Sequence, residues 1–135
     1  MALTMEGALI DLIKSDGPIA AVVSGRVYPL KRPQGSAYPV IISTRISGQP
    51  LYADDGEVGL QNARMQIDSI AENYTDAKDL AQLVRALLTA FSGVHAGIDF
   101  SYIMLDEERD LQEGGSDAAE YPVRIATDFI VWTRG

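Results

Sequence analysis

Apolar and polar residues alternate with a period of two in four stretches of the chain, as they do in half-buried β-strands. The pattern predicts strands over residues 39–47, 61–71, about 98–111 and 121–133. Along the second of these, Arg64, Gln66 and Asp68 form a polar side that we expect to face water. The last strand is apolar on both sides. One side is expected to meet helices and the other a neighbouring subunit, unless both faces of the sheet are covered within one chain.

Two segments place apolar residues three and four positions apart, the spacing of an amphipathic helix. The first runs from about Thr4, a candidate N-cap, to Lys14. The second starts with Thr75 as its N-cap and closes at Gly93. A short helical turn is expected over residues 19–23. Residues 27–37, which contain two prolines, a glycine and the two basic residues Lys31 and Arg32, are expected to form a loop.

The predicted order is helix, hairpin, helix, hairpin. Residues 48–60 contain many turn formers and acids, so they are expected to form either an extended hairpin arm or a flexible loop. The fold class predicted is α+β: an antiparallel sheet of about four strands, in two hairpins, with two main helices packed on one face. No repeat or linker divides the chain, so residues 1–135 are expected to form a single domain.

The overall charge restricts the partners that the protein can bind. Nineteen acidic and eleven basic residues give a net charge of −8. Tight binding to a phosphate backbone needs clustered bases, so specific nucleic-acid binding is not expected. There is no cysteine and no sign of a signal peptide, and the apolar run over residues 18–23 is too short to span a bilayer. No membrane association is therefore predicted.

Candidate chemistry is sparse. His95 is the single histidine, and no nucleophile motif or phosphate-binding loop accompanies it, so a loop or C-cap role is favoured over catalysis. Asp106, Glu108 and Asp110 could share one strand face and bind a metal ion, but a solvated strand end is the favoured interpretation. We expect no enzyme activity, no metal site and no cofactor.

Charged and aromatic residues in the loops and strand ends are candidates for contacts with other proteins. The basic residues near the first loop, together with Arg45, could meet an acidic partner surface or be solvated. Acidic residues of the two long loops could reach neighbours or line a lumen. The candidate interface residues are Arg26, Lys31, Arg32, Asp54, Asp55, Glu57, Glu107, Glu108 and Trp132.

Several short motifs, in order and spacing, resemble the small tail-completion proteins of long-tailed bacteriophages and gene transfer agents, also called tail terminators or tail-to-head joining proteins. The resemblance extends over nearly the whole chain. It is carried by Gly25-Arg-Val-Tyr-Pro29, Pro33-Gln-Gly35, Tyr38-Pro-Val-Ile-Ile42, Arg64-Met-Gln-Ile-Asp68, Ala71-Glu-Asn-Tyr-Thr-Asp-Ala77 and Asp128-Phe-Ile-Val-Trp132.

The resemblance implies a structural protein that assembles as a hexameric ring on the head-proximal end of a tail tube, stops tube growth and offers a docking surface to the head. Its partners would be further copies of itself, the tail tube protein and head–tail connector or neck proteins. DNA would pass through the lumen without specific binding. The protein would be made in the bacterial cytoplasm and end in the virion or phage-like particle. Two alternatives remain: another neck protein, such as a head-completion protein, or a dimeric α+β module that binds a small ligand.

Overall fold

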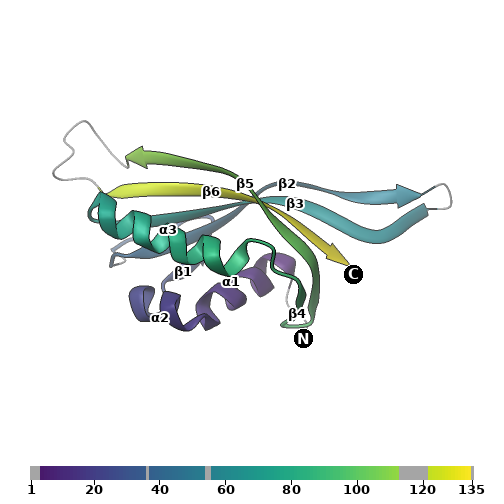
Figure 1. Cartoon of the computed structure of the whole chain (residues 1–135), viewed down its shortest axis with the longest axis horizontal. Coiled ribbons are helices and arrows are strands. Elements are labelled where there is room, and N and C mark those ends of the chain that lie inside the picture. Colours follow the sequence, from purple (N-terminus) through teal and green to yellow (C-terminus); the bar gives the residue numbers. More distant parts are fainter. Residues whose placement is uncertain (1–3, 36, 54–55, 113–121, 135) are drawn as a thin grey trace.

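A single twisted sheet runs along the long dimension of the protein, and helices cover only one of its faces (Figure 1). The computed structural model describes residues 4–35, 37–53, 56–112 and 122–134. The helices within these residues are α1 (Met5–Ser15), α2 (Gly17–Val23) and α3 (Tyr74–Leu88). The strands are β1 (Val27–Pro29), β2 (Val40–Ala53), β3 (Gly56–Ala71), β4 (Gly93–His95), β5 (Ile98–Gln112) and β6 (Val123–Arg134).

The predicted α+β class is confirmed, but the predicted number of strands is too low. The sheet has six strands in the order β1-β2-β3-β6-β5-β4, and β1 pairs with β2 in parallel, so the sheet is mixed rather than antiparallel. The two unpredicted strands, β1 and β4, have three residues each, which is too short to show alternation. β1 falls in the segment predicted as a loop and is held by pairing of Val27 with Ile41.

The helix starts and ends were predicted with mixed success. Thr4 is the N-cap of α1, as predicted, and its Oγ1 accepts a hydrogen bond from the Gly7 N–H at 3.1 Å. The N-cap of α3 is Asn73 instead of Thr75, because the Asn73 side chain accepts from the Asp76 N–H at 2.9 Å. α3 also ends at Leu88, before the predicted Gly93, because Thr89 adopts an extended conformation.

The core lies between the helices and the covered face of the sheet. The alternation of β6 is confirmed: Phe129 and Val131 are buried in this core, whereas Ile130 and Trp132 lie on the other face and are only half-buried. Burial of such large apolar side chains contributes about 1.5–3 kcal/mol each. Other core residues are Leu9, Ile13, Ile19, Ile41, Met65, Ile67, Leu80, Val84, Leu88, Phe100 and Ile103.

Residues 48–53 and 56–60 are paired strands of an extended hairpin arm, so the first of the two predicted alternatives is the one observed. β2 and β3 stay paired out to Ala53 and Gly56. The pairing of β3 with β6 ends at Leu60 and Arg134, so beyond this point only two strands continue. We call this outer part, residues 51–53 and 56–59, the arm. It projects past the helices at one end of the sheet (Figure 1).

Gly48 lies where the arm leaves the body of the sheet, and it has no room for a side chain. A Cβ atom at this position would lie 2.9 Å from the backbone oxygen of Asn62 on the paired strand. We expect Gly48→Ala to lower the free energy of unfolding by about 1–3 kcal/mol, since strands must shift to admit the methyl group. Urea denaturation measures the change.

Gly17→Ala is the matched control, because a Cβ atom there meets nothing within 4 Å. Its free energy of unfolding should stay within about 0.5 kcal/mol of the wild type. Equal stability of the two variants would show that the close approach at Gly48 is not a constraint.

Candidate protein interfaces

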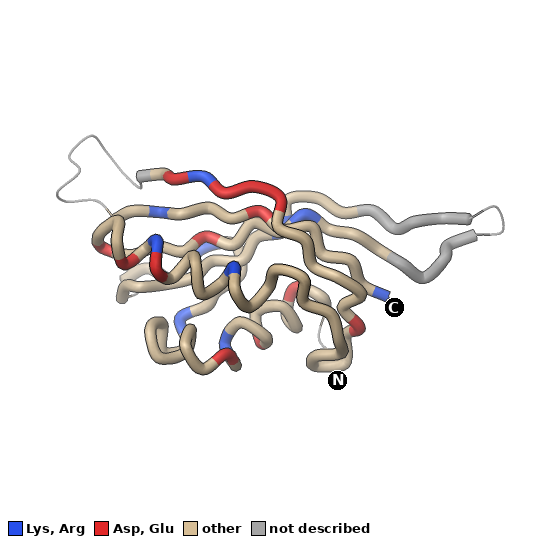
Figure 2. Tube along the Cα trace, viewed as in Figure 1, with Lys and Arg blue, Asp and Glu red and all other residues tan. Residues whose placement is uncertain are grey.

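The sheet face opposite the helices carries a layer of ion pairs across the three neighbouring strands β3, β6 and β5. We call this the charged layer: Arg64, Gln66 and Asp68 of β3, Asp106, Glu107 and Arg109 of β5, and Arg124 and Asp128 of β6. Figure 2 shows the acidic run of β5 as a red stretch of that strand. The polar side of β3 was predicted to face water, but much of it is covered by these neighbouring side chains, and Asp68 is only 1% exposed.

Asp128 is the centre of the layer, with a side chain that is 5% exposed. Its Oδ2 accepts from Arg64 Nη2 at 3.0 Å and from Arg109 Nη1 at 3.1 Å. Arg109 also donates to Gln66 Oε1 at 3.1 Å, so it joins all three strands. The hydrogen bond to Asp128 is the main reason why the pKa of Arg109 is raised. Paired in this way, the buried carboxylate avoids the large penalty of an isolated charge.

Asp68 is the second buried carboxylate. Its Oδ2 lies 3.0 Å from Arg124 Nη1, and its Oδ1 accepts from Gln66 Nε2 at 3.0 Å. Burial raises the pKa of Asp68, because removing the carboxylate from water disfavours its charged form, and the nearby charge of Arg124 opposes this shift.

The acidic run of β5 divides between the two faces of the sheet. A bulge between Leu105 and Glu107 places Asp106 against Arg64 of the charged layer, at 2.6 Å. Glu108 instead faces α3, where its carboxylate lies 2.5 Å from Lys78 Nζ and 3.4 Å from Arg85 Nη1. Asp110 lies on the same side as Glu108, since its Oδ1 is 3.5 Å from Lys78 Nζ, so Asp106 lies apart from the other two candidate metal ligands. No cluster of three or more metal-binding side chains occurs within the described ranges.

An apolar strip adjoins the charged layer on the same face. Tyr102 and Met104 of β5 pair with Trp132 and Ile130 of β6. Tyr102 is 44% exposed and Met104 is 43% exposed, although both are large apolar side chains. Neighbouring exposed apolar side chains of this kind often mark a contact with another protein. Trp132, predicted as an interface residue, is part of this apolar strip.

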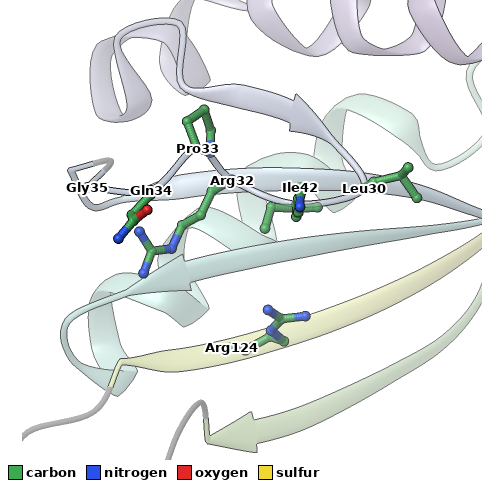
Figure 3. A pocket seen from close by; sticks show the side chains of 8 residues that line it. Leu30, Arg32, Pro33, Gln34, Gly35, Ile42 and Arg124 are labelled. Atoms are coloured by element: carbon green, nitrogen blue, oxygen red, sulfur yellow. The ribbon is translucent and has the colours of Figure 1, made fainter.

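The loop after β1 forms a groove of about 420 Å³ against the same sheet face (Figure 3). Lys31 and Arg32 line it from the loop, while Ile42 of β2 and Arg124 of β6 line it from the sheet. The Arg32 guanidinium lies 4.8 Å from the centre of the Tyr38 ring, a cation–π contact that orients the arginine. Arg124 was not found from the sequence, because it lies more than ninety positions from Lys31 and Arg32, in a strand with no basic run.

Three other charged residues predicted as contact candidates, Arg26, Arg45 and Glu107, do not line this groove. Arg26 does not line the groove, since its Nε donates to the Pro39 carbonyl at 2.9 Å and fixes the start of β2. Arg45 pairs with Glu6 of α1 at 3.3 Å, on the helix side. Glu107 pairs with Arg109 inside the charged layer.

The acidic residues of the segment 48–60 and the single histidine are the remaining candidates. Asp54, Asp55 and the side chain of Glu57 lie outside the described residues. His95 Nε2 is 2.7 Å from Asp11 Oδ2, a contact that ties β4 to α1. Within the described ranges, no helix combines the length and apolarity needed to cross a membrane.

The raised pKa of Asp68 predicts a specific pH dependence of stability. The folded protein holds this proton up to a higher pH than the unfolded chain does. The charged form of Asp68 therefore lowers stability near pH 7, and stability is recovered as the pH falls through the raised pKa towards the ordinary value of 3.8. The Asp68→Asn variant has no titratable carboxyl group at this position, so it lacks this pH dependence of stability. We expect the wild type to gain stability relative to the variant as the pH falls, by about 1.4 kcal/mol per unit of pKa shift.

Urea denaturation of both proteins at several pH values between about 4 and 7 measures this difference. Asp79→Asn makes the same change at an exposed position of α3 and gives the baseline. Parallel pH curves for wild type and Asp68→Asn would contradict the burial argument.

Comparison with known proteins gives the family. A chain in the virion of a native gene transfer agent particle has the same fold, with a TM-score of 0.69 over 97% of this chain and 95% of that chain, at 16% sequence identity. No curated protein sequence matches the chain. The model of the family described as Tail completion protein gp17 matches residues 7–133. The predicted resemblance to tail-completion proteins, and with it a structural rather than an enzymatic role, is therefore confirmed. The chain belongs to the tail completion protein gp17 family.

Proposed function

We propose that this protein forms a hexameric ring on the head-proximal end of a phage-like tail tube, stops tube growth and provides the surface to which the head docks. The observation that carries the proposal, besides family membership, is the one-sided sheet. Helices cover one face, while the other presents the charged layer, the apolar strip and the groove. A protein that works by contact with partners needs such surfaces, and a self-contained domain does not.

The exposed features divide naturally between several contacts. The apolar strip suits a packed contact with a neighbouring subunit or with the tail tube protein, since burial of Tyr102 and Met104 would stabilise the complex. The arm extends beyond the body and suits reach toward a neighbour. In a ring of this kind, the subunits together meet the last tube ring on one side and neck proteins on the other.

The acidity of the chain fits a lumen through which DNA moves. A net charge of −8 repels the phosphate backbone at short range, so DNA would pass without being held. The fold shared with a chain of a gene transfer agent virion supports a particle of that general kind as the place where the protein ends.

The test is deletion of the gene in the producing strain, with complementation, followed by electron microscopy of the particles. Tails of excessive length without heads, cured by the wild-type gene, are expected because nothing would stop tube growth. Tails of normal length without heads would indicate another neck role instead. Normal joined particles would overturn the proposal and favour a ligand-binding module, for which ligand-induced thermal stabilisation is the check.

A charge placed in the apolar strip should separate folding from assembly. Trp132→Asp puts a carboxylate on the uncovered face, outside the helix-side core. We expect a cooperatively folded protein that restores joined particles at least about tenfold less well than the wild type, because burying an unpaired charge in an interface costs several kcal/mol.

Ala86→Asp is the control, since Ala86 is exposed on α3. It adds the same charge away from the uncovered sheet face and should complement like the wild type. Complementation by Trp132→Asp at the wild-type level would show that the apolar strip is not an interface.

A further inference from the structure

Leu30 combines a strained backbone conformation with high exposure. It follows β1 directly (Figure 3), and its φ of 65° lies in the left-handed region that favours glycine and asparagine. Its side chain is 73% exposed, more than any other large apolar side chain that the structure describes. The other described non-glycine residues with positive φ are small: Ser24, Ala90 and Ala96. The chain therefore holds a large apolar side chain in water, in a conformation that disfavours it.

The turn itself does not require a leucine. The Leu30 N–H donates to the Ser43 carbonyl at 3.0 Å, and the Lys31 N–H donates to the Pro29 carbonyl at 2.7 Å. Both are backbone hydrogen bonds, which a glycine at position 30 would keep while fitting the positive φ without strain. Strain that folding does not need is typical of positions that serve a contact or another function.

The apolar strip on β5 and β6 is a surface that matches Leu30 in chemistry but lies too far away in the same chain. Leu30 lies at the β1 edge of the sheet, and three strand spacings separate β1 from β6. At about 4.8 Å for each spacing, this distance is about 14 Å, beyond the reach of a leucine side chain. Leu30 and the apolar strip therefore stay uncovered by one another within one subunit.

The charges beside these two apolar features are also complementary. Lys31, next to Leu30, is exposed and makes no ion pair within the residues that the structure describes. The side chains of Asp106 and Glu107, close to the strip on β5, are 39% and 52% exposed. Ion pairs link five side chains at this end of the charged layer: Arg64, Asp106, Glu107, Arg109 and Asp128. Three acids against two bases leave this group with a net charge of −1, which suits a neighbouring lysine.

We propose that the apolar strip receives Leu30 from a second copy of this chain, with Lys31 of that copy beside Asp106 and Glu107. The contact is head-to-tail, with different surfaces on the two subunits, and its repetition closes a ring when the rotation between subunits allows it. This inference rests on the proposed ring function and names the contact that links the subunits.

Substitution of Leu30 separates folding from assembly. Leu30→Gly and Leu30→Asn both suit the positive φ, so each should unfold cooperatively at a urea concentration close to that of the wild type. In the deletion strain, each should restore joined particles at least about tenfold less well, the factor that corresponds to the loss of one buried leucine contact.

Two controls keep an apolar contact or remove an unrelated one. Leu30→Met retains a large apolar side chain and should complement at the wild-type level. Val94→Ser removes an apolar side chain that is 71% exposed on β4, outside the proposed contact, and should also complement normally.

Cross-linking in assembled particles tests the contact directly. The chain has no cysteine, so introduced thiols are the only ones it contains. Leu30→Cys with Met104→Cys, produced together with the wild type so that particles assemble, should give dimers and larger species with a short bis-maleimide. Leu30→Cys with Ala86→Cys, which places the second thiol on α3, should give none.

Two outcomes would overturn the proposal. One is wild-type complementation by Leu30→Gly and Leu30→Asn. The other is the absence of cross-linked dimers from particles that contain the Leu30→Cys, Met104→Cys chain, which would leave the strip to another partner such as the tail tube protein. The deletion phenotype is scored separately, so failure of this contact is distinguishable from failure of the proposed function.

Discussion

The pairing of β3 with β6 is the contact on which the rest of the structure depends. It joins the two hairpins through strands that lie more than fifty residues apart in sequence, and it runs from Leu60 with Arg134 to Ala71 with Val123. Because side chains alternate between the faces of a sheet, this register also decides what lies on each side. Met65 and Phe129 are paired and face the core on the side covered by the helices. Gln66 and Asp128 are paired and lie on the uncovered face. A shift by one residue would bring charge into the core.

That register explains why buried charge is tolerated on the uncovered face. Asp68 and Asp128 are nearly inaccessible, but arginines from neighbouring strands hydrogen-bond to both. Removing one partner of such a pair leaves a buried charge without compensation and typically costs 3–5 kcal/mol. The charged layer therefore ties the strands together, but its charged groups lose hydration when they are buried. A purely apolar surface would not have this desolvation penalty. The charged layer also keeps the uncovered face polar enough to coexist with water before partners bind.

The sequence predicted the parts of this architecture that have strong local signals. The four long strands and the two main helices follow from periodicity, and Thr4 follows from cap chemistry. The three-residue strands β1 and β4 could not be predicted, because only pairing with β2 and β5 makes them strands. The same holds for the site. Lys31 and Arg32 stand out as adjacent bases, whereas the position of Arg124 beside them depends on the sheet order. Pairing between strands that are distant in sequence decides these features, and the local pattern of apolar and polar residues does not reveal that pairing.

The acidic run of β5 has a further effect on how the protein behaves when many copies are made at once. β4 pairs with β5 at residues 98–100, and the backbone of Ala90 and Phe91 hydrogen-bonds to Ile103. Beyond Ile103, no strand among the described residues pairs with this outer side of β5, so its edge is open there. An open edge invites strands of other molecules to add to the sheet, and charged side chains along it oppose such addition. Asp106, Glu107, Glu108 and Asp110 lie along this edge. The run thus acts against aggregation of the many copies that are present at once.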